Sequence, residues 1–214
     1  MRFTNKQGIA VVRAIIEAVC AQRELLSQVD AAVGDGDHGV NMSRGFSLAG
    51  EALDQREADM SEGFLTIAKV LIGKIGGSMG PLYGSFFRGL AEASKEKDVI
   101  DAAVIGEMVR KGYERLALLT EAKPGDKTLI DVLDPAVRAY EETAFEGGNL
   151  EVCLTRMVKA AETGLEATKG MAARLGRGSR LGDRAIGHQD AGATSCYIIL
   201  KALADKALLL AKTD

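Results

Sequence analysis

The sequence predicts an all-α protein of seven or eight antiparallel helices, and three observations support this fold class. Apolar residues recur at steps of three, four or seven along most of the chain, which is the period of an amphipathic helix. Runs of β-branched residues that alternate with period two are rare, so no strand is predicted. The glycines gather in clusters between the apolar stripes, where we expect connections that are mostly short and leave neighbouring helices antiparallel.

The apolar stripes place the helices in order along the chain. Pro81 fits the first turn of the third helix, where its missing N–H group needs no partner. Pro135 predicts a kink or an early break in the fifth helix. Because the helices alternate in direction, we expect alternate connections at the same end of the bundle. The stripes cover residues 9–29, 64–71, 81–90, 104–116, 129–140, 150–171 and 196–212.

Length and composition favour one domain over residues 1–214, because the 214 residues show neither a repeat nor a low-complexity linker. With 27 basic and 30 acidic side chains the formal charge is −3, so we expect no nucleic-acid partner and no membrane partner. The chain shows no signal peptide and no apolar run near the ~20 residues of a membrane span, which predicts a cytoplasmic protein. Cys20, Cys153 and Cys196 are scattered and odd in number, which favours buried apolar roles over disulfides or zinc.

The densest polar cluster holds Asp30, Asp35 and Asp37, interleaved with glycines. Like charges this close repel one another unless cations or hydrogen-bond donors neutralise them. Carboxylate oxygens suit Mg²⁺ or Ca²⁺, and the helix predicted from about Asn41 would point an anion-binding N-terminus at the same place. Together these features predict a site for a metal ion and a phosphate group.

Residue spacing excludes an EF-hand at this cluster and the usual nucleotide-binding motifs elsewhere in the chain. An EF-hand that began at Asp35 would need ligands at Gly39 and Phe46, which offer none, so that interpretation fails. A P-loop fails because Gly73 and Lys74 are followed by Ile75, and no glycine-rich fingerprint follows a strand. A solvated acidic turn, with Asp side chains as helix caps, stays open from the residues alone.

Three further clusters repeat this combination of glycine and polar residues. Residues 76–85 form a glycine-rich loop before a helix and fit either a phosphate cradle or close helix packing. Residues 124–128 read as a turn before a helix cap. Residues 176–192 carry three arginines in eight positions and fit either a polyphosphate clamp or a basic surface loop. His38 and His188 both lie within these clusters, which favours a functional role for them.

Four motifs resemble the L subunit, the nucleotide-binding domain, of dihydroxyacetone kinases. Their order and spacing are similar across nearly the whole chain. The motifs are GDGDHGVNMSRGF (residues 34–46), GGSMGPLYGSFF (76–87), PGDKT (124–128) and GRGSRLGDRAIGHQDAGATS (176–195).

This resemblance implies a barrel-like bundle of eight antiparallel helices with ADP or ATP bound at one end. Three aspartates, which match Asp30, Asp35 and Asp37, would hold two Mg²⁺ ions and serve catalysis. Arg177 would share the charge of the transferring phosphate. The residues that would touch the nucleotide are His38, Gly39, Val40, Asn41, Ser78, Met79, Thr128, Leu129, Arg177, Asp190, Ala191 and Gly192.

The resemblance also implies partners. A separate K subunit would bind the ketose, and in the phosphotransferase-system branch an M subunit would rephosphorylate the bound ADP. Homo-oligomerisation is compatible with the sequence. Two positions depart from the family pattern: Met79 stands where a hydroxyl donor is common, and Ala191 replaces a proline.

Two alternatives remain. The chain would instead serve an ATP-dependent kinase for dihydroxyacetone or another short ketose, or it would be a regulatory module that senses phosphorylation state. We expect the Asp35→Asn and Asp37→Asn variants to lose phosphoryl transfer while the helices stay folded.

Overall fold

The computed structural model describes residues 1–212, except the side chain of Arg177. Within that part of the chain the structure is almost entirely helical, as predicted. Two short strands, β1 (Phe3–Thr4) and β2 (Val99–Ile100), form an antiparallel pair. The helices are α1 (Ile9–Ala21), α2 (Arg23–Ala31), α3 (His38–Asp54), α4 (Met60–Lys74), α5 (Met79–Ser94), α6 (Ala102–Ala117), α7 (Ile130–Phe145), α8 (Leu150–Ala167) and α9 (Ala191–Ala211), with 3₁₀ helices η1 (Thr168–Gly170) and η2 (Arg177–Ala185).

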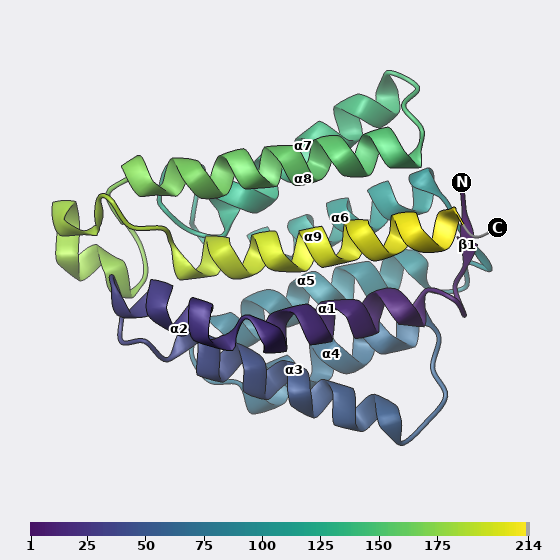
Figure 1. Ribbon diagram of the computed structural model, residues 1–214, viewed down its shortest axis with the longest axis horizontal. Coiled ribbons are helices and arrows are strands. Elements are labelled where there is room, and N and C mark those ends of the chain that lie inside the picture. Colours follow the sequence, from purple (N-terminus) through teal and green to yellow (C-terminus); the bar gives the residue numbers. More distant parts are fainter. Residues whose placement is uncertain (213–214) are drawn as a thin grey trace.

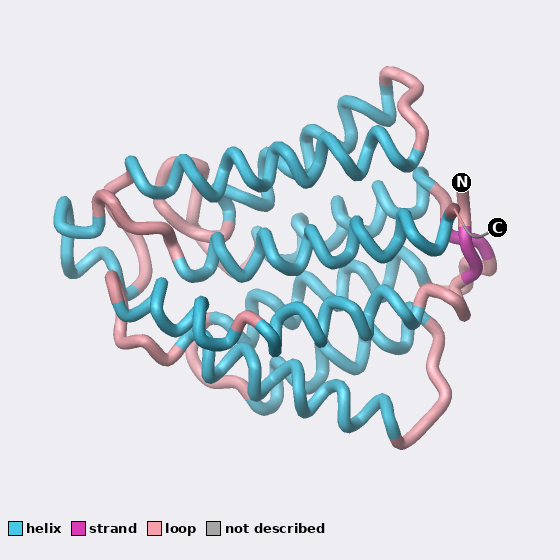
Figure 2. The backbone as a smooth tube through the Cα atoms, viewed as in Figure 1, coloured by secondary structure: helices cyan, strands magenta, loops and turns pink. Residues whose placement is uncertain are grey.

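The long helices run antiparallel along one axis (Figure 1). The pair β1–β2, the N-terminus and the end of α9 lie at one end, at the right of Figure 1. The connections after α2, α4, α6 and α8 lie at the opposite end, at the left of Figure 2. This confirms the prediction that alternate connections share one end, which we call the loop end.

Side-chain caps explain where several helices begin. Asp59 and Glu62 form a reciprocal capping box at the start of α4. The side chains of Asp101, Asn149 and Asp190 accept backbone N–H groups in the first turns of α6, α8 and α9. Each bond satisfies a donor that the helix itself leaves unpaired, so the sequence fixes these ends locally.

The core lies between the helices and is rich in aromatic side chains. The ring of Phe87 packs edge-on against Phe46 and Phe86, with centroids 5.6 and 5.4 Å apart, and is stacked on Phe64 at 5.9 Å. All four rings are buried. Burial of large aromatic and aliphatic side chains of this kind is the main stabilising contribution to a helical bundle.

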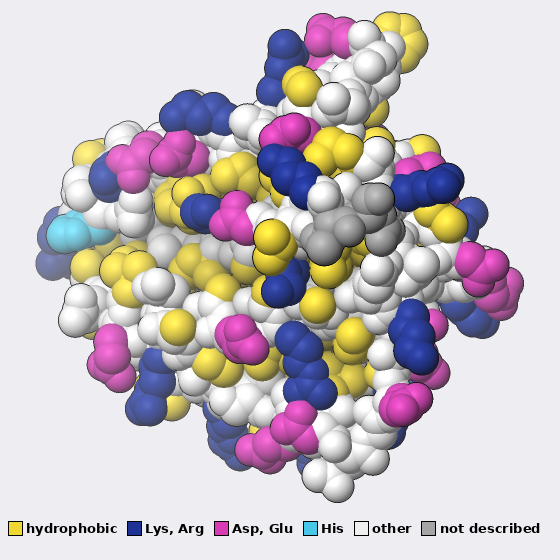
Figure 3. Space-filling view, turned by 45° about the vertical axis from the view of Figure 1, so that its right-hand side comes forward, with side chains coloured by type: hydrophobic (Ala, Val, Ile, Leu, Met, Phe, Trp, Pro, Cys, Tyr) yellow, Lys and Arg dark blue, Asp and Glu magenta, His cyan; other side chains and the backbone are white. Residues whose placement is uncertain are grey.

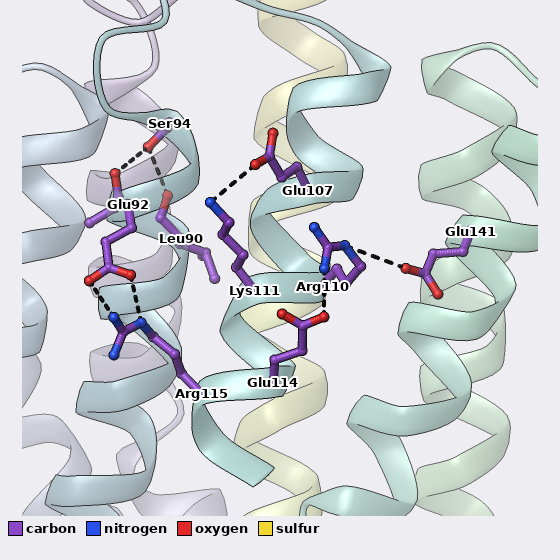
Figure 4. Close-up of polar contacts among 10 residues, drawn as sticks. Leu90, Glu92, Ser94, Glu107, Arg110, Lys111, Glu114, Arg115 and Glu141 are labelled. Atoms are coloured by element: carbon purple, nitrogen blue, oxygen red, sulfur yellow. Dashed lines mark hydrogen bonds and ion pairs between the residues drawn. The ribbon is translucent and has the colours of Figure 1, made fainter. Parts of the chain in front are cut away.

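Ion pairs on the surface link neighbouring helices (Figure 4). Arg115 of α6 donates two hydrogen bonds, at 2.6 and 2.7 Å, to the carboxylate of Glu92 on α5. Arg110 lies between Glu114 of its own helix and Glu141 of α7. Beneath them, a Cβ on Gly89 would meet the backbone of Gly112 at 2.5 Å, so α5 and α6 approach as closely as glycine allows.

Four details differ from the sequence prediction. The first apolar stripe forms two helices because the backbone leaves helical geometry at Gln22 (φ −97°, ψ 15°), a break that no Gly or Pro announces. Pro135 lies inside α7, which continues to Phe145, so an early break at Pro135 is wrong, and a kink there stays a prediction. The two-residue strands are too short for a period of two to be visible. Cys153 and Cys196 are buried as expected, whereas Cys20 is half-buried.

The surface carries mixed charge. On the face shown in Figure 3, basic and acidic side chains are interspersed rather than gathered into patches of one sign. None of the helices in residues 1–212 combines the length and the apolar composition needed to cross a lipid bilayer.

Candidate functional site

A cavity of about 710 Å³ opens at the loop end of the bundle. Every sequence cluster singled out above contributes to its wall. Its lining residues fall within 30–41, 76–82, 119–130, 173–178 and 190–192. The fold therefore gathers four distant clusters around one space.

Asp30 and Asp37 line this cavity, whereas Asp35 is exposed and is not among its lining residues; we call these three residues the acidic wall. Each offers one carboxylate oxygen, and the three oxygens lie within 4.8 Å of one another. Asp30 sits in the last turn of α2, and its Oδ2 accepts the backbone N–H of His38 at 3.2 Å. Three converging carboxylates are the hard oxygen ligands that Mg²⁺ prefers, so the donor set fits a divalent cation.

Glycines give the acidic wall its shape. Gly36 has φ +78°, a left-handed conformation that turns the chain between Asp35 and Asp37. A Cβ on Gly39 would lie 2.1 Å from the backbone oxygen of Arg23 and 2.6 Å from the backbone N of Ser27. The start of α3 is thus pressed against α2, and no larger residue fits at position 39.

His38 begins α3 and lines the cavity, but its side chain is buried. Its Nε2 lies 2.9 Å from Ser195 Oγ, which lies 2.7 Å from the hydroxyl of Tyr83. The Tyr83 hydroxyl donates to the carbonyl of Gly192 at 2.9 Å. Burial lowers the pKa of His38 to about 4, against an opposing effect of Asp30, so the imidazole is neutral at pH 7. This chain of bonds joins α3, α5 and α9 beneath the cavity.

The two other residues of this motif that were expected to touch a nucleotide lie off the cavity. Gly39 is buried under α2, and Val40 is exposed elsewhere on α3; neither lines the cavity. Asn41, one turn into the helix, does line it. Helical periodicity accounts for this division, because residues 38 and 41 share a face that residues 39 and 40 do not.

The glycine-rich loop supplies a second wall. Ser78 and Met79 line the cavity, as expected, together with Gly76 and Gly77. Helix α5 begins at Met79, so Pro81 falls in its first turn as predicted. Unpaired N–H groups of a helix start therefore lie at the cavity edge, which favours an anion there.

Thr128 and Leu129 line the cavity just before α7 begins. The buried carboxylate of Asp131 shapes this turn by accepting the N–H groups of Gly125 and Thr128. Sequence analysis missed Asp131, because a carboxylate early in a helix normally reads as a simple cap.

Asp190, Ala191 and Gly192 all line the cavity where α9 begins. The Oδ2 of Asp190 caps that helix by accepting the N–H of Ala193 at 2.7 Å. Burial raises the pKa of Asp190 to about 6, partly offset by this hydrogen bond and by Lys127.

Residues 168–188 form the remaining wall, which we call the cap. The cap contains η1 and η2, and Gly182 breaks η2 with a left-handed φ of +55°. Gly176 and Gly178 line the cavity on either side of Arg177. The side chain of Arg177 itself lies outside the described part of the structure. His188, in the same segment, is exposed and does not line the cavity.

Comparison with known proteins identifies the family to which this arrangement belongs. The model of the DAK2 domain matches residues 32–205. The chain belongs to the DAK2 domain family.

Members of the DAK2 family with similar sequences include kinase subunits and longer kinases. The chain is 37% identical over 185 residues to the protein named PEP-dependent dihydroxyacetone kinase, ADP-binding subunit DhaL, of Escherichia coli; the match covers 86% of this chain and 88% of that one. It is 32% identical over 198 residues to D-erythrulose kinase of Mycolicibacterium smegmatis, covering 90% of this chain and 34% of that one.

The DAK2 fold is also seen in a solved structure, the dihydroxyacetone kinase from C. freundii in complex with AMP-PNP and Mg²⁺. The TM-score is 0.68 at 24% sequence identity, and the match covers 92% of this chain and 33% of that chain. At this identity the likeness establishes the helical fold.

Proposed function

We propose that this chain is the nucleotide-binding, phosphoryl-transferring subunit of a dihydroxyacetone kinase that draws its phosphate from a phosphotransferase system. In this proposal residues 1–214 act as one L-type domain that binds ADP or ATP with two Mg²⁺ ions. Phosphate passes from the nucleotide to dihydroxyacetone held on a separate K subunit, and an M subunit rephosphorylates the bound ADP. The E. coli relative, named as an ADP-binding subunit of a PEP-dependent kinase, supports this assignment.

One observation carries the proposal: oxygens of three carboxylates lie within 4.8 Å of one another, and two of these residues, Asp30 and Asp37, line the cavity where the starts of α3, α5 and α9 also lie. The carboxylates suit a divalent cation, and the helix starts suit phosphate groups. A nucleoside diphosphate with Mg²⁺ combines both chemistries in one ligand.

Each group has a distinct part in this mechanism. Asp30, Asp35 and Asp37 would hold the Mg²⁺, which when bound neutralises charge on the phosphate oxygens. The backbone N–H groups at the starts of α5 and α9 orient the phosphates. Neutral His38 fixes the first turn of α3 against α9. We assign Arg177 to the charge of the transferring group, from its place in the cap.

We further propose that the remaining nucleotide contacts come from the lining residues Asn41, Ser78, Met79, Thr128, Leu129, Asp190, Ala191 and Gly192. Met79 offers no hydroxyl, so backbone N–H groups and the hydroxyl of Ser78 supply the donors of this loop. Neither Gly39 nor Val40 reaches the cavity: Gly39 contributes by its packing against α2, and Val40 is exposed.

Reconstitution tests the proposal. The purified chain is mixed with a dihydroxyacetone-loaded K subunit and one of two phosphate sources, a phosphorylated M subunit or ATP, and dihydroxyacetone phosphate is measured by mass spectrometry. With the phosphorylated M subunit, we expect dihydroxyacetone phosphate to form even when ADP is present in much smaller amount than dihydroxyacetone. Product only with stoichiometric ATP would favour the ATP-dependent kinase instead. Erythrulose as a competing substrate tests whether this chain also serves the sugar named for the mycobacterial relative.

Absence of sugar phosphate with either source would contradict transfer. If nucleotide still bound under those conditions, the chain would instead be a module that senses phosphorylation state.

A further inference from the structure

The side chain of Lys127 is buried, and its ammonium group is surrounded by backbone carbonyls. Its exposed fraction is 1%. The Nζ donates to the carbonyl oxygens of Thr168 at 2.7 Å, Ala185 at 2.9 Å, His188 at 2.6 Å and, more weakly, Met171 at 3.2 Å. Lys127 is one of the residues that line the cavity, but its three N–H bonds are shared among four protein acceptors, so its Nζ has no capacity left for a ligand.

All four carbonyls belong to the cap, 41 to 61 residues further along the chain. They come from both ends of the segment, so one charged group, together with the hydrogen bond from Gly187 N–H to the carbonyl of Lys169, joins the entry at η1 to the exit before α9. The bonds are charge-assisted, which makes them stronger than bonds between neutral groups.

Besides Lys127, backbone hydrogen bonds hold the cap: Gly187 N–H donates to the carbonyl of Lys169 at 2.7 Å, and Arg174 N–H donates to the carbonyl of Asp126 at 3.2 Å. Apolar burial contributes little. Among its described side chains between Met171 and His188, Ala185 is the one that is buried. A segment without apolar burial has low local stability and opens easily unless polar contacts fix it. Lys127 itself has φ +60°, an unfavourable conformation for a side chain with a Cβ, so the turn is held in a shape that directs this side chain inward.

We propose that Lys127 is a positioning residue: its ammonium group organises residues 168–188 into the cap of the cavity and thereby sets the affinity for nucleotide without contacting the nucleotide. The proposal rests on the proposed function for the identity of the ligand. It differs from the usual role of a lysine beside a phosphate site, where the ammonium group would pair with the phosphate. Here that group is already engaged by the protein.

The experiment replaces Lys127 and restores its charge from solution. The Lys127→Ala variant leaves a space lined by carbonyls that a small alkylammonium ion can enter. If nine molecules in ten then have a disordered cap, the dissociation constant for MgADP rises about 10-fold. We expect propylammonium to restore affinity, while tetramethylammonium at equal ionic strength, which has no N–H group, does not.

Two further measurements accompany the titration. Hydrogen exchange should become faster in residues 168–188 of Lys127→Ala and stay unchanged in α4 and α8. The matched control is Lys123→Ala, which removes an exposed lysine four residues earlier in the same turn and should change neither affinity nor exchange.

Normal affinity and normal exchange in Lys127→Ala would overturn the proposal. A Lys127→Arg variant with full affinity would also overturn it, because a flat guanidinium cannot replace an ammonium among four carbonyls but can pair with phosphate. If Lys127→Ala fails to fold, NMR of wild-type protein labelled with ¹⁵N-lysine decides. We expect one lysine to have slowly exchanging Nζ protons. If every lysine exchanges its Nζ protons quickly, the proposal is contradicted.

If the wild-type protein does not bind MgADP, the proposed function fails. The exchange measurement on residues 168–188 then still decides whether Lys127 orders the cap.

Discussion

The acidic wall and the cap both border the same cavity but are built in different ways. The acidic wall is local: Asp30 bonds to the backbone of His38, and Gly39 packs on Arg23 and Ser27. The cap is held across 41 to 61 residues by Lys127. One wall therefore takes its shape from a short stretch of sequence, and the other depends on the finished fold. Substitutions in one wall should therefore leave the structure of the other wall unchanged.

The largest effect is expected in the acidic wall. In the Asp35→Asn, Asp37→Asn double variant we expect affinity for ADP in Mg²⁺ to fall about 1000-fold or more, since loss of even outer-shell partners of a metal costs 10–100-fold each. The helical circular dichroism should stay at the wild-type level, because both residues lie on a loop rather than in the core. Asp98→Asn, an exposed change near the strand end of the bundle, is the matched control.

Wild-type affinity in the double variant would show that the carboxylates take no part in nucleotide binding.

A methyl group at position 39 tests how closely α3 is packed on α2. Because the added Cβ of Gly39→Ala would meet backbone atoms at 2.1 and 2.6 Å, we expect the free energy of unfolding to fall by about 3 kcal/mol. Chemical denaturation measures this change. Gly73→Ala, in α4 with nothing within 4 Å of the added Cβ, should instead stabilise by roughly 0.5–1 kcal/mol. Equal stability of the two variants would mean that the two helices can separate without cost.

The turn that carries Lys127 is the next test. Asp131→Asn replaces an oxygen that accepts a backbone N–H with an amide that cannot, so we expect a loss of about 2 kcal/mol in unfolding free energy. Hydrogen exchange should increase in residues 124–128 and in the cap, but not around Asp37. Glu142→Gln, an exposed change in the same helix, is the control. Faster exchange in the acidic wall would contradict the independence of the two walls.

The last effect, similar in size to the preceding one, is a dependence of stability on pH. The pKa of Asp190 is about 6 in the folded protein and near 4 when unfolded, so the folded state binds the extra proton between these values. Stability then rises as the pH falls from 7 to 4, and this contribution is lost as the pH rises through about 6. In Asp190→Asn, which keeps an oxygen for the helix cap, this rise should be smaller by about 2 kcal/mol. Parallel pH curves for the two proteins would contradict a raised pKa.

The same difference between local and distant contacts determines which parts of the site the sequence predicted. Asp30, Asp35, Asp37 and their glycines lie within eight residues, so spacing alone indicated their chemistry. The Asp and Asn caps at the starts of α4, α6 and α8 are equally local, although the helices were predicted from apolar periodicity and these caps were not named. Local information suffices where the interacting groups are neighbours in the chain.

The remaining features depend on distant contacts. Ser195 meets His38 and Tyr83, which lie 157 and 112 residues earlier, and no periodicity records such a meeting. Lys127 bonds to backbone carbonyls, which every residue possesses, so nothing in the partner residues announces the contact. The break at Gln22 likewise has no residue that would predict it.

The central claim is that the acidic wall binds a nucleotide through a divalent cation. The most direct test is calorimetric titration of the nucleotide-free wild-type protein with ADP, first in Mg²⁺ and then in chelator. The account predicts saturable binding to one site in Mg²⁺ and loss of most of that affinity in chelator. Equal binding under both conditions, or none in Mg²⁺ by folded protein, would contradict it.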